Sequence, residues 1–185
     1  CEFNRRSEFI LKVLIKTLKN YKGDQIMIIG HNKSLLKYLH DAIVDRKISD
    51  VGYYMGGMKP KDLKESENKP VIIATYAMAE EALDIKTLAI LLMATPKVDV
   101  RQAVGRILRS VDGQKLVVDI IDQHPIFQRH WKKRRTWYNK QTFKIMHTDI
   151  EGFKKDNWQL LKKRGKIKVN IPSSDPLSIF SQGKC

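Results

Sequence analysis

Cysteine is scarce in the sequence, and no long hydrophobic run is present. The two cysteines, Cys1 and Cys185, lie at opposite ends of the 185 residues. They exclude a dense disulfide framework and a four-ligand zinc site, so we expect an intracellular, reducing compartment. No apolar stretch approaches the roughly 20 residues of a transmembrane helix. The opening CEFNRRSEF has no apolar core of a secretory signal. We therefore expect neither secretion nor a membrane partner.

Acidic residues are also few, and positive charge dominates. The sequence holds 35 Lys and Arg against 20 Asp and Glu, which gives a formal net charge of +15. Such a balance favours a polyanionic partner, nucleic acid before a membrane surface. Residues 127–168 contain fourteen basic residues against three acidic ones, and all three tryptophans. The five histidines show no metal-ligand spacing, so no metal site is expected.

Short apolar runs alternate with helical patterns in the first two thirds of the chain. Apolar runs predict strands at residues 25–30, 51–55, 70–76, 88–94 and 115–121. Helical spacing predicts helices between them, including residues 9–18 after Ser7, a helix capped by Asn32 or Ser34, and residues 98–109. This alternation is typical of an α/β fold with a parallel sheet, whose ligands bind at the carboxyl ends of the strands.

The alternation stops at about residue 123. Residues 124–146 predict a long basic helix and residues 153–163 a second helix. A short strand is expected at residues 166–171, followed by an irregular tail. We therefore divide the chain into an α/β domain at residues 1–122 and a basic, mostly helical extension and tail at residues 123–185.

The basic extension has two interpretations that the sequence leaves open. In the first, a run of cations interleaved with aromatic residues contacts phosphates and stacks on bases. Those cations are Lys132, Lys133, Arg134 and Arg135. In the second, an amphipathic helix packs its aromatic residues on the domain and leaves its lysines in water. Those aromatic residues are Trp131, Trp137, Tyr138 and Phe143.

The segment QAVGRILR, residues 102–109, carries two arginines on one helical face. Gln102, Arg106 and Arg109 project the same way from a helix. Gly105 permits close approach, and two guanidinium groups suit an anion such as a triphosphate. Taken alone, such a pair is more often a solvated helix face.

Two other strand ends carry polar residues. Thr75 follows a strand and can offer its hydroxyl and N–H to phosphate, whereas Asp84 can accept from a sugar hydroxyl or orient an arginine. An ordinary strand-end threonine and a helix-capping aspartate explain each residue alone. Residues 27–36, MIIGHNKSLL, offer backbone amides and the side chains of His31, Asn32 and Lys33, although this junction is common.

In their order along the chain, these segments resemble a known family. Strand–GHNKS–helix, Gly56-Gly57-Met58, VIIATYAMAEEALDI and QAVGRILR resemble motifs IV, V and VI in the second RecA-like domain of superfamily 2 helicases, over residues 8–122. The phrase ATPK-V-DV-RQAVGRILR, followed by LVVDIID and a basic helix, is similar to the helicase branch of large DNA viruses and some phages. That branch includes the vaccinia-type transcript-release helicases.

The resemblance implies roles for individual residues. Arg106 and Arg109 would be arginine fingers that reach the γ-phosphate of ATP, with Gln102 and Gly105 at the same cleft and Asp84 near the ribose. The nucleic-acid strand would be held by Thr75, Gly56, His31, Asn32 and Lys33. Ala82 stands where the family usually has glycine, which weakens the match to the family motif at Ala82 itself but not at Asp84.

Two motifs of a complete motor are missing. The sequence has no G-x-x-x-x-G-K-[ST] and no DExx acid pair after a strand. In the family both lie on the first RecA-like domain, which would bind ATP and Mg²⁺. The resemblance thus implies the C-terminal half of an ATP-dependent helicase or translocase, inactive alone, acting on DNA before RNA. The alternatives are a non-catalytic nucleic-acid-binding module on a decayed motor fold and a duplex-DNA translocase. A viral member would work in the host cytoplasm or virion, for example in transcription.

Overall fold

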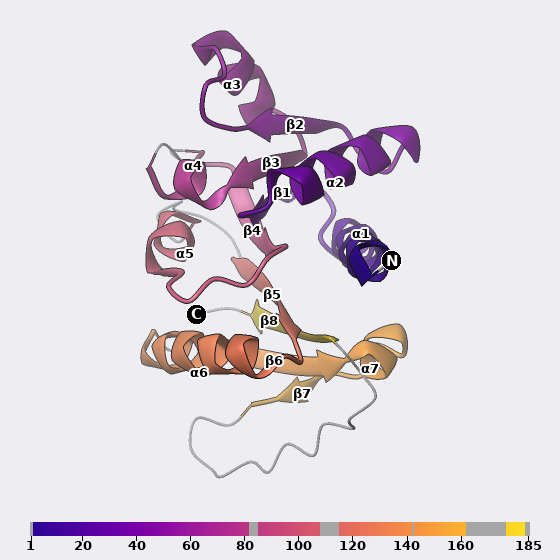
Figure 1. The fold of residues 1–185 in the computed structure, drawn as a ribbon, viewed down its shortest axis with the longest axis vertical. Coiled ribbons are helices and arrows are strands. Elements are labelled where there is room, and N and C mark those ends of the chain that lie inside the picture. The colour runs from indigo at the N-terminus through magenta and orange to yellow at the C-terminus, as the bar shows by residue number, and fades with distance from the viewer. Residues whose placement is uncertain (1, 82–84, 108–114, 142, 162–176, 184–185) are drawn as a thin grey trace.

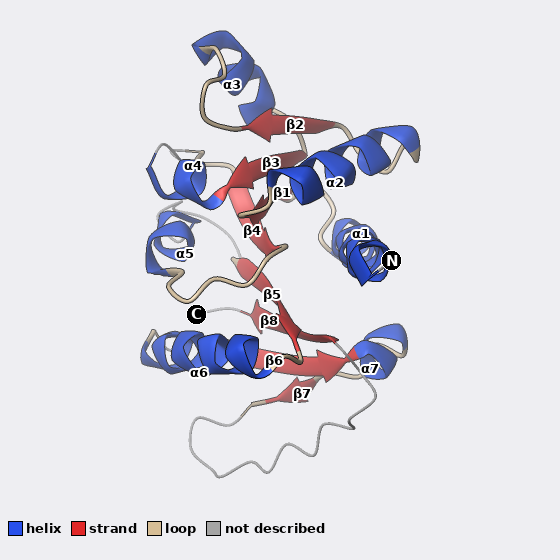
Figure 2. Cartoon of the chain, in the orientation of Figure 1, coloured by secondary structure: helices blue, strands red, loops and turns tan. Residues whose placement is uncertain are grey.

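Five parallel strands form the centre of the molecule. The computed structural model describes residues 2–81, 85–107, 115–141, 143–161 and 177–183. The central strands are β1 (Gln25–Gly30), β2 (Val51–Tyr54), β3 (Val71–Thr75), β4 (Leu88–Met93) and β5 (Leu116–Asp122). They pair in the order β2-β3-β1-β4-β5. The predicted parallel α/β fold and its five strands are confirmed (Figure 2).

The sheet continues beyond β5 with antiparallel strands. β8 (Leu177–Gly183) pairs with β5, followed by β6 (Lys144–Asp149) and β7 (Gln159–Leu160). The order of the eight strands is therefore β2-β3-β1-β4-β5-β8-β6-β7. Strands from both sides of residue 122 thus share one sheet.

Helices cover both faces of this sheet (Figure 1). One face carries α1 (Glu2–Asn20), α2 (Lys33–Asp45) and α7 (Ile150–Lys154). The other carries α4 (Tyr76–Glu81), α5 (Arg101–Ile107) and α6 (Pro125–Lys140). The helix α3 (Pro60–Glu67) lies beside β2, at the edge of the sheet. Among the described residues, no helix is both long enough and apolar enough to cross a bilayer.

A separate hydrophobic core fills the space on each side of the sheet. Within β1, Ile26 and Ile28 pack with α1 and α2, whereas Met27 and Ile29 pack with α4, α5 and α6. All four side chains are fully buried. Because successive side chains of a strand point to opposite faces, burial on both faces requires the continuous apolar run seen in the sequence.

The extension differs from its predicted helices. The helix predicted over residues 124–146 ends at Lys140, and residues 144–149 form β6 instead. The predicted helix at residues 153–163 is replaced by the short α7 and by β7. The tail, predicted to be irregular, contains β8, which pairs with the otherwise open backbone edge of β5. The strand predicted at residues 166–171 lies outside the described residues. Ser7, predicted to cap a helix, is buried inside α1.

Candidate nucleic-acid and nucleotide interface

The loops that carry three of the predicted residues lie next to one another. His31 follows β1, Gly56 follows β2 and Thr75 ends β3, and these strands are adjacent in the order β2-β3-β1. Gly30 and Thr75 are direct partners in the β1–β3 pairing. Because parallel strands end at the same edge, the structure brings these positions together as the sequence predicts.

Local hydrogen bonds already use two of these side chains. The Asn32 side chain caps α2 by accepting a hydrogen bond from the Leu35 N–H at 3.1 Å. The Thr75 hydroxyl accepts from the Met78 N–H at 3.4 Å, at the start of α4. Each contact matches the ordinary structural interpretation of the residue. Lys33, the first residue of α2, is exposed.

A cluster around His31 and Tyr76 orders this edge. The His31 N–H donates to the Thr95 hydroxyl at 2.9 Å, and the Tyr76 hydroxyl donates to the Thr95 carbonyl at 2.6 Å. The His31 and Tyr76 rings lie 4.5 Å apart between centroids. Partial burial and the nearby Lys97 lower the pKa of His31, so its imidazole is mostly neutral at pH 7. A neutral ring can both donate and accept hydrogen bonds.

Lys97 completes this cluster. Its ammonium group forms an ion pair with Glu80 and lies 4.8 Å from the centroid of the Tyr76 ring. Tyr76, Thr95, Lys97 and Glu80 were not among the residues predicted to form the site. Thr95 and Lys97 follow the fourth predicted strand directly, and that position at the carboxyl edge is the signal that could have found them.

The Gly56-Gly57 turn has different requirements at its two glycines. Gly57 has φ of +86°, a conformation that side chains rarely adopt. A Cβ at Gly56 would meet only the Met78 sulfur, at the ordinary distance of 3.9 Å. The turn therefore needs glycine at Gly57, whereas Gly56, the predicted nucleic-acid contact, has room for a side chain.

The helix α5 presents a polar side away from the core. Ala103 and Val104 are buried, Gln102 is exposed, and Gly105 and Arg106 are partly exposed. A Cβ at Gly105 would meet no described atom within 4 Å. Arg109 and Asp84, the other two predicted ATP contacts, lie outside the described residues, as does Ala82.

Arg134 was predicted to bind nucleic acid, and this prediction is wrong. Its side chain is fully buried, and its Nε and Nη2 donate to Asp119 at 2.7 and 2.9 Å. Its Nη1 donates to the carbonyl of Lys97. The cause is position, since Arg134 lies on the face of α6 that packs on the sheet. Lys132 and Lys133 are exposed and Arg135 is half-buried.

The aromatic residues of the extension support its packing interpretation. Trp131, Tyr138 and Phe143 are buried in the core on the α4–α6 side of the sheet. Trp137 is half-buried, with its ring centroid 5.9 Å from that of Phe143. Helix α6 is thus amphipathic, and Trp131, Tyr138 and Phe143 belong to the core rather than to a stacking surface.

The carboxylates at the end of β5 pair with arginines. Asp119 binds Arg134, and Asp122 lies 3.1 Å from the Arg6 guanidinium. Within the described ranges, no group of three or more His, Cys, Asp or Glu side chains could hold a metal ion.

Solved structures share the fold at low sequence identity. No protein-family model matches the chain. The C-terminal part of the Fun30 ATPase domain aligns with a TM-score of 0.56 and 14% identity, over 69% of this chain and 44% of that one. The Pyrococcus furiosus Hef helicase domain aligns with a TM-score of 0.54 and 16% identity, over 70% of this chain and 28% of that one. T4 UvsW aligns with a TM-score of 0.54 and 20% identity, over 73% of this chain and 32% of that one.

Sequence relatives come from viruses. A protein of Acanthamoeba polyphaga mimivirus named "Putative ATP-dependent RNA helicase L396" is 34% identical over 176 residues, which are 91% of this chain. Together with the shared fold, this similarity decides the family. The chain belongs to the superfamily 2 helicase C-terminal domains. "Uncharacterized protein 108L" of Invertebrate iridescent virus 3 is 32% identical to this helicase domain over 77 residues, 41% of the chain and 74% of that protein.

This helicase C-terminal domain corresponds to a fraction of its relative. The chain spans 34% of the length of the mimiviral protein. The predicted superfamily and its RecA-like fold are therefore confirmed, together with a viral relationship.

Proposed function

We propose that this domain is the C-terminal half of an ATP-dependent nucleic-acid helicase or translocase. Its partner would be an N-terminal RecA-like domain of the same protein, which binds most of the ATP and Mg²⁺. In this proposal Arg106 and Arg109 reach the γ-phosphate across the cleft between the two domains. The observation that carries the proposal is the polar side of α5, where Gln102, Gly105 and Arg106 lie opposite the buried Ala103 and Val104.

Gly105 supports a close approach at this surface. Glycine inside a helix costs about 1 kcal/mol relative to alanine. The space at its Cβ position is open to the described atoms, so packing within the described part of the domain does not require glycine there. An approaching phosphate or protein surface would require it. We infer that the ATP-bearing surface closes against this point of α5.

Arginine at this place has a defined chemical task. The transition state of phosphoryl transfer spreads negative charge over the equatorial oxygens of the γ-phosphoryl group, and a planar cation stabilises that charge. Arg106 and Arg109 are three residues apart in the sequence, a spacing that places two side chains on one face of a helix. Gln102 and Asp84 would contact the nucleotide beside them.

The carboxyl edge and α6 would hold the nucleic acid. The exposed loop at His31, Asn32 and Lys33 offers one cation and backbone amides, next to Gly56 and Thr75. The solvent side of α6 adds Lys132, Lys133 and Arg135. We propose DNA before RNA, as in the resembled viral branch, while the name of the mimiviral relative specifies RNA. Both polymers belong in the test.

The test uses a longer protein that includes the N-terminal domain. Arg106→Ala and Arg109→Ala should each lower the ATPase kcat by about 10³-fold or more, the usual contribution of an arginine finger. Binding of labelled single-stranded DNA or RNA should be retained. The matched control is Arg46→Ala, an exposed arginine at the end of α2, which should leave kcat unchanged.

Three outcomes separate the candidate functions. Unchanged ATPase activity in both finger variants would refute the motor proposal. Absent ATPase activity in the unmodified longer protein, with oligonucleotide binding intact, would identify a non-catalytic binding module. ATPase activity stimulated by duplex DNA, without separation of its strands, would identify a translocase.

A further inference from the structure

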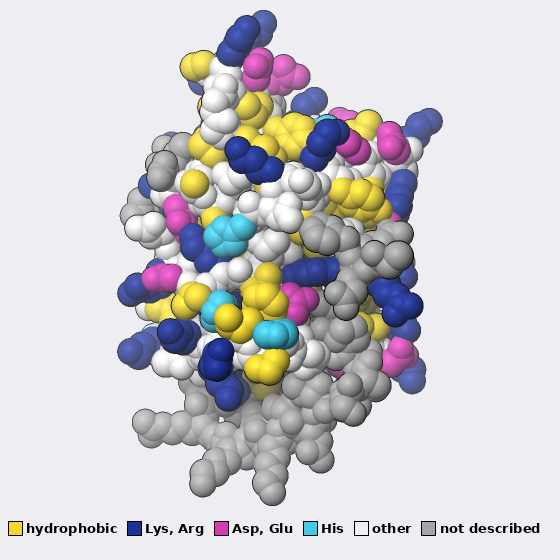
Figure 3. Space-filling model, viewed as in Figure 1, with side chains coloured by type: hydrophobic (Ala, Val, Ile, Leu, Met, Phe, Trp, Pro, Cys, Tyr) yellow, Lys and Arg dark blue, Asp and Glu magenta, His cyan; other side chains and the backbone are white. Residues whose placement is uncertain are grey.

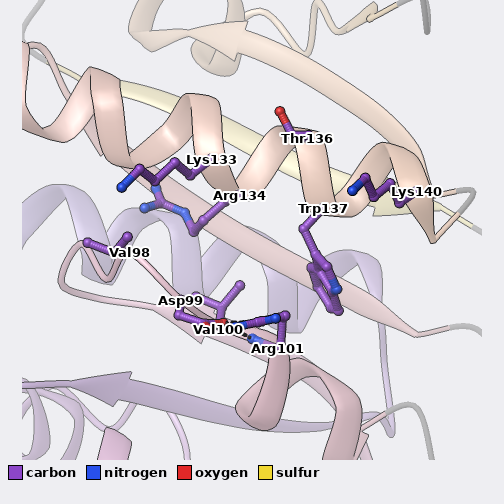
Figure 4. A pocket seen from close by; sticks show the side chains of 9 residues that line it. All are labelled: Val98, Asp99, Val100, Arg101, Lys133, Arg134, Thr136, Trp137 and Lys140. Atoms are coloured by element: carbon purple, nitrogen blue, oxygen red, sulfur yellow. Dashed lines mark hydrogen bonds and ion pairs between the residues drawn. The ribbon is translucent and has the colours of Figure 1, made fainter.

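A groove lies between α6 and the segment that leads into α5. One wall is formed by residues 98–101, and the other by Lys133, Thr136, Trp137 and Lys140 of α6, over a cavity of about 290 Å³. Trp137 extends from α6 toward Arg101, with Lys133 and Lys140 on either side of it along the helix (Figure 4). We call this cavity the α5–α6 groove. One wall belongs to the segment that follows β4 at the carboxyl edge, and Arg101 adjoins Gln102.

The charges of the groove do not cancel. Arg101 donates from Nε to both carboxylate oxygens of Asp99 at 2.9 Å, and the charge of Arg134 is matched by Asp119. The sequence of α6 contains no Asp or Glu. Among the described residues, neither Lys133 nor Lys140 forms an ion pair. Two uncompensated ammonium groups therefore border the groove.

These lysines belong to one stripe of the helix. Arg129, Lys133 and Lys140 are exposed and follow the spacing i, i+4, i+11, which repeats on one helical face. The opposite face packs Trp131 and Tyr138 in the core. Figure 3 shows Lys and Arg side chains gathered over α6. At a rise of about 1.5 Å per residue, Lys133 and Lys140 are about 10 Å apart along the axis of α6.

Trp137 supplies an aromatic surface between the two lysines. Its ring contacts the rings of Phe143 and Tyr138, with centroid distances of 5.9 and 5.4 Å. The residue remains half-buried and lines the groove. An aromatic ring held in place between cations is the arrangement by which proteins bind single-stranded nucleic acids, because every base offers a π-face.

We propose that the α5–α6 groove binds a single-stranded nucleic-acid segment, with Lys133 and Lys140 on its phosphates and Trp137 stacked on a base. This inference rests on the proposed function and adds a second contact region to it. The segment at residues 98–101 leads directly to Gln102, so a strand in this groove lies beside the proposed nucleotide-contacting side of α5. Binding there would couple the basic extension to the motor surface.

The test measures fluorescence anisotropy of a fluorescein-labelled 15-residue oligothymidylate titrated with the 185-residue chain. Trp137→Leu should weaken binding by about 5- to 150-fold, the range for loss of one stacked base. Lys133→Gln with Lys140→Gln should lower the slope of log K against log salt by about 1.4, because each single-strand phosphate contributes about 0.7. Lys12→Gln with Lys19→Gln, an exposed pair on α1 with the same seven-residue spacing, should leave the slope unchanged.

Control variants distinguish a loss of binding from unfolding, and a failure of the groove assignment from a failure of the proposed function. Trp137→Phe keeps an aromatic ring and should bind more tightly than Trp137→Leu, with a melting temperature close to that of the unmodified chain. A duplex of equal length should bind without dependence on Trp137. Wild-type affinity in the leucine and double-glutamine variants would overturn the groove assignment while leaving the proposed function intact. Absence of oligonucleotide binding by the unmodified chain would also overturn the groove assignment, whereas the ATPase test on the longer protein decides the proposed function.

Discussion

The two faces of the sheet use their charged residues differently. On the α1–α2 face, two surface cations have acidic partners on the helices: Arg46 binds Glu8, and Lys37 binds Asp41. On the α4–α6 face, Asp119 pairs with Arg134 inside the molecule, Glu80 of α4 pairs with Lys97, and Asp99 pairs with Arg101. The lysines of α6 are left without such partners among the described residues. Two of these lysines, Lys133 and Lys140, line the proposed α5–α6 groove.

Burying the Arg134–Asp119 ion pair costs desolvation free energy. Desolvating two charges is expensive and is offset only by good geometry and further hydrogen bonds. Here the guanidinium makes two bonds to the carboxylate and a third to the carbonyl of Lys97. Because that carbonyl belongs to the loop before α5, the pair also holds the extension against the candidate nucleotide-contacting helix.

The largest expected effect comes from breaking that pair. Asp119→Ala leaves the Arg134 charge buried without a counter-ion and should lower the free energy of unfolding by about 3–5 kcal/mol. Asp99→Ala breaks the exposed pair with Arg101 on the same face and should cost at most about 1 kcal/mol. Urea denaturation measures both.

A double variant sharpens this result. Asp119→Leu with Arg134→Met replaces both charges by apolar side chains of related size, so most of the lost stability should return. Equal losses from Asp119→Ala and Asp99→Ala would show that the buried and exposed pairs do not differ, and would remove the contrast between them.

The central fold was accessible from the sequence because its strands are buried on both faces. A run such as residues 25–30 must then be apolar throughout, and the pattern predicts the strand and its parallel neighbours. Strand β8 was missed because residues 177–183 pair with β5 across about 60 positions, and their turn-rich surroundings give no local sign of that pairing. Non-local pairing escapes local patterns.

The candidate site also has parts that the sequence could predict and parts that it could not. His31 and Thr75 could be predicted to meet, because parallel strands end at one edge. The contacts of Tyr76 with Thr95 depend on loop conformation, which no spacing rule gives. Arg134 was misjudged within a basic run, although a signal existed. It lies three residues after Trp131 and four before Tyr138, on the apolar face of α6.

Two glycines test the difference between packed and open sites. A Cβ at Gly52 would lie 2.7 Å from the Ser66 hydroxyl oxygen and 3.0 Å from its Cα, so Gly52→Ala should destabilise the fold by about 1–3 kcal/mol. The measurement is again urea denaturation. A neutral Gly52→Ala variant would mean that α3 shifts away from β2 without cost.

Gly105→Ala should act in the opposite direction on stability. The position is open within the described structure, so alanine should raise the free energy of unfolding of the chain by about 0.5–1 kcal/mol. In the longer protein the same variant should lower ATPase activity if another surface approaches α5 there. Higher stability with unchanged ATPase activity would contradict a close approach of another surface to α5 at Gly105. Gly52→Ala is the comparison variant, at a glycine whose Cβ position is already occupied by neighbouring atoms.

The smallest expected effect concerns the α1–α2 face and its exposed charges. Hydrogen bonds from Arg46 and Tyr38 lower the pKa of Glu8 to about 2. Protonation therefore favours the unfolded state, and the stabilisation is present above the ordinary glutamate pKa of about 4.3 and is lost as pH falls toward 2. Because the pair is exposed, Glu8→Gln should cost at most about 1 kcal/mol at pH 7 and nothing near pH 2. Urea denaturation at several pH values compares the variant with the unmodified chain. A difference that grows on acidification would contradict this assignment.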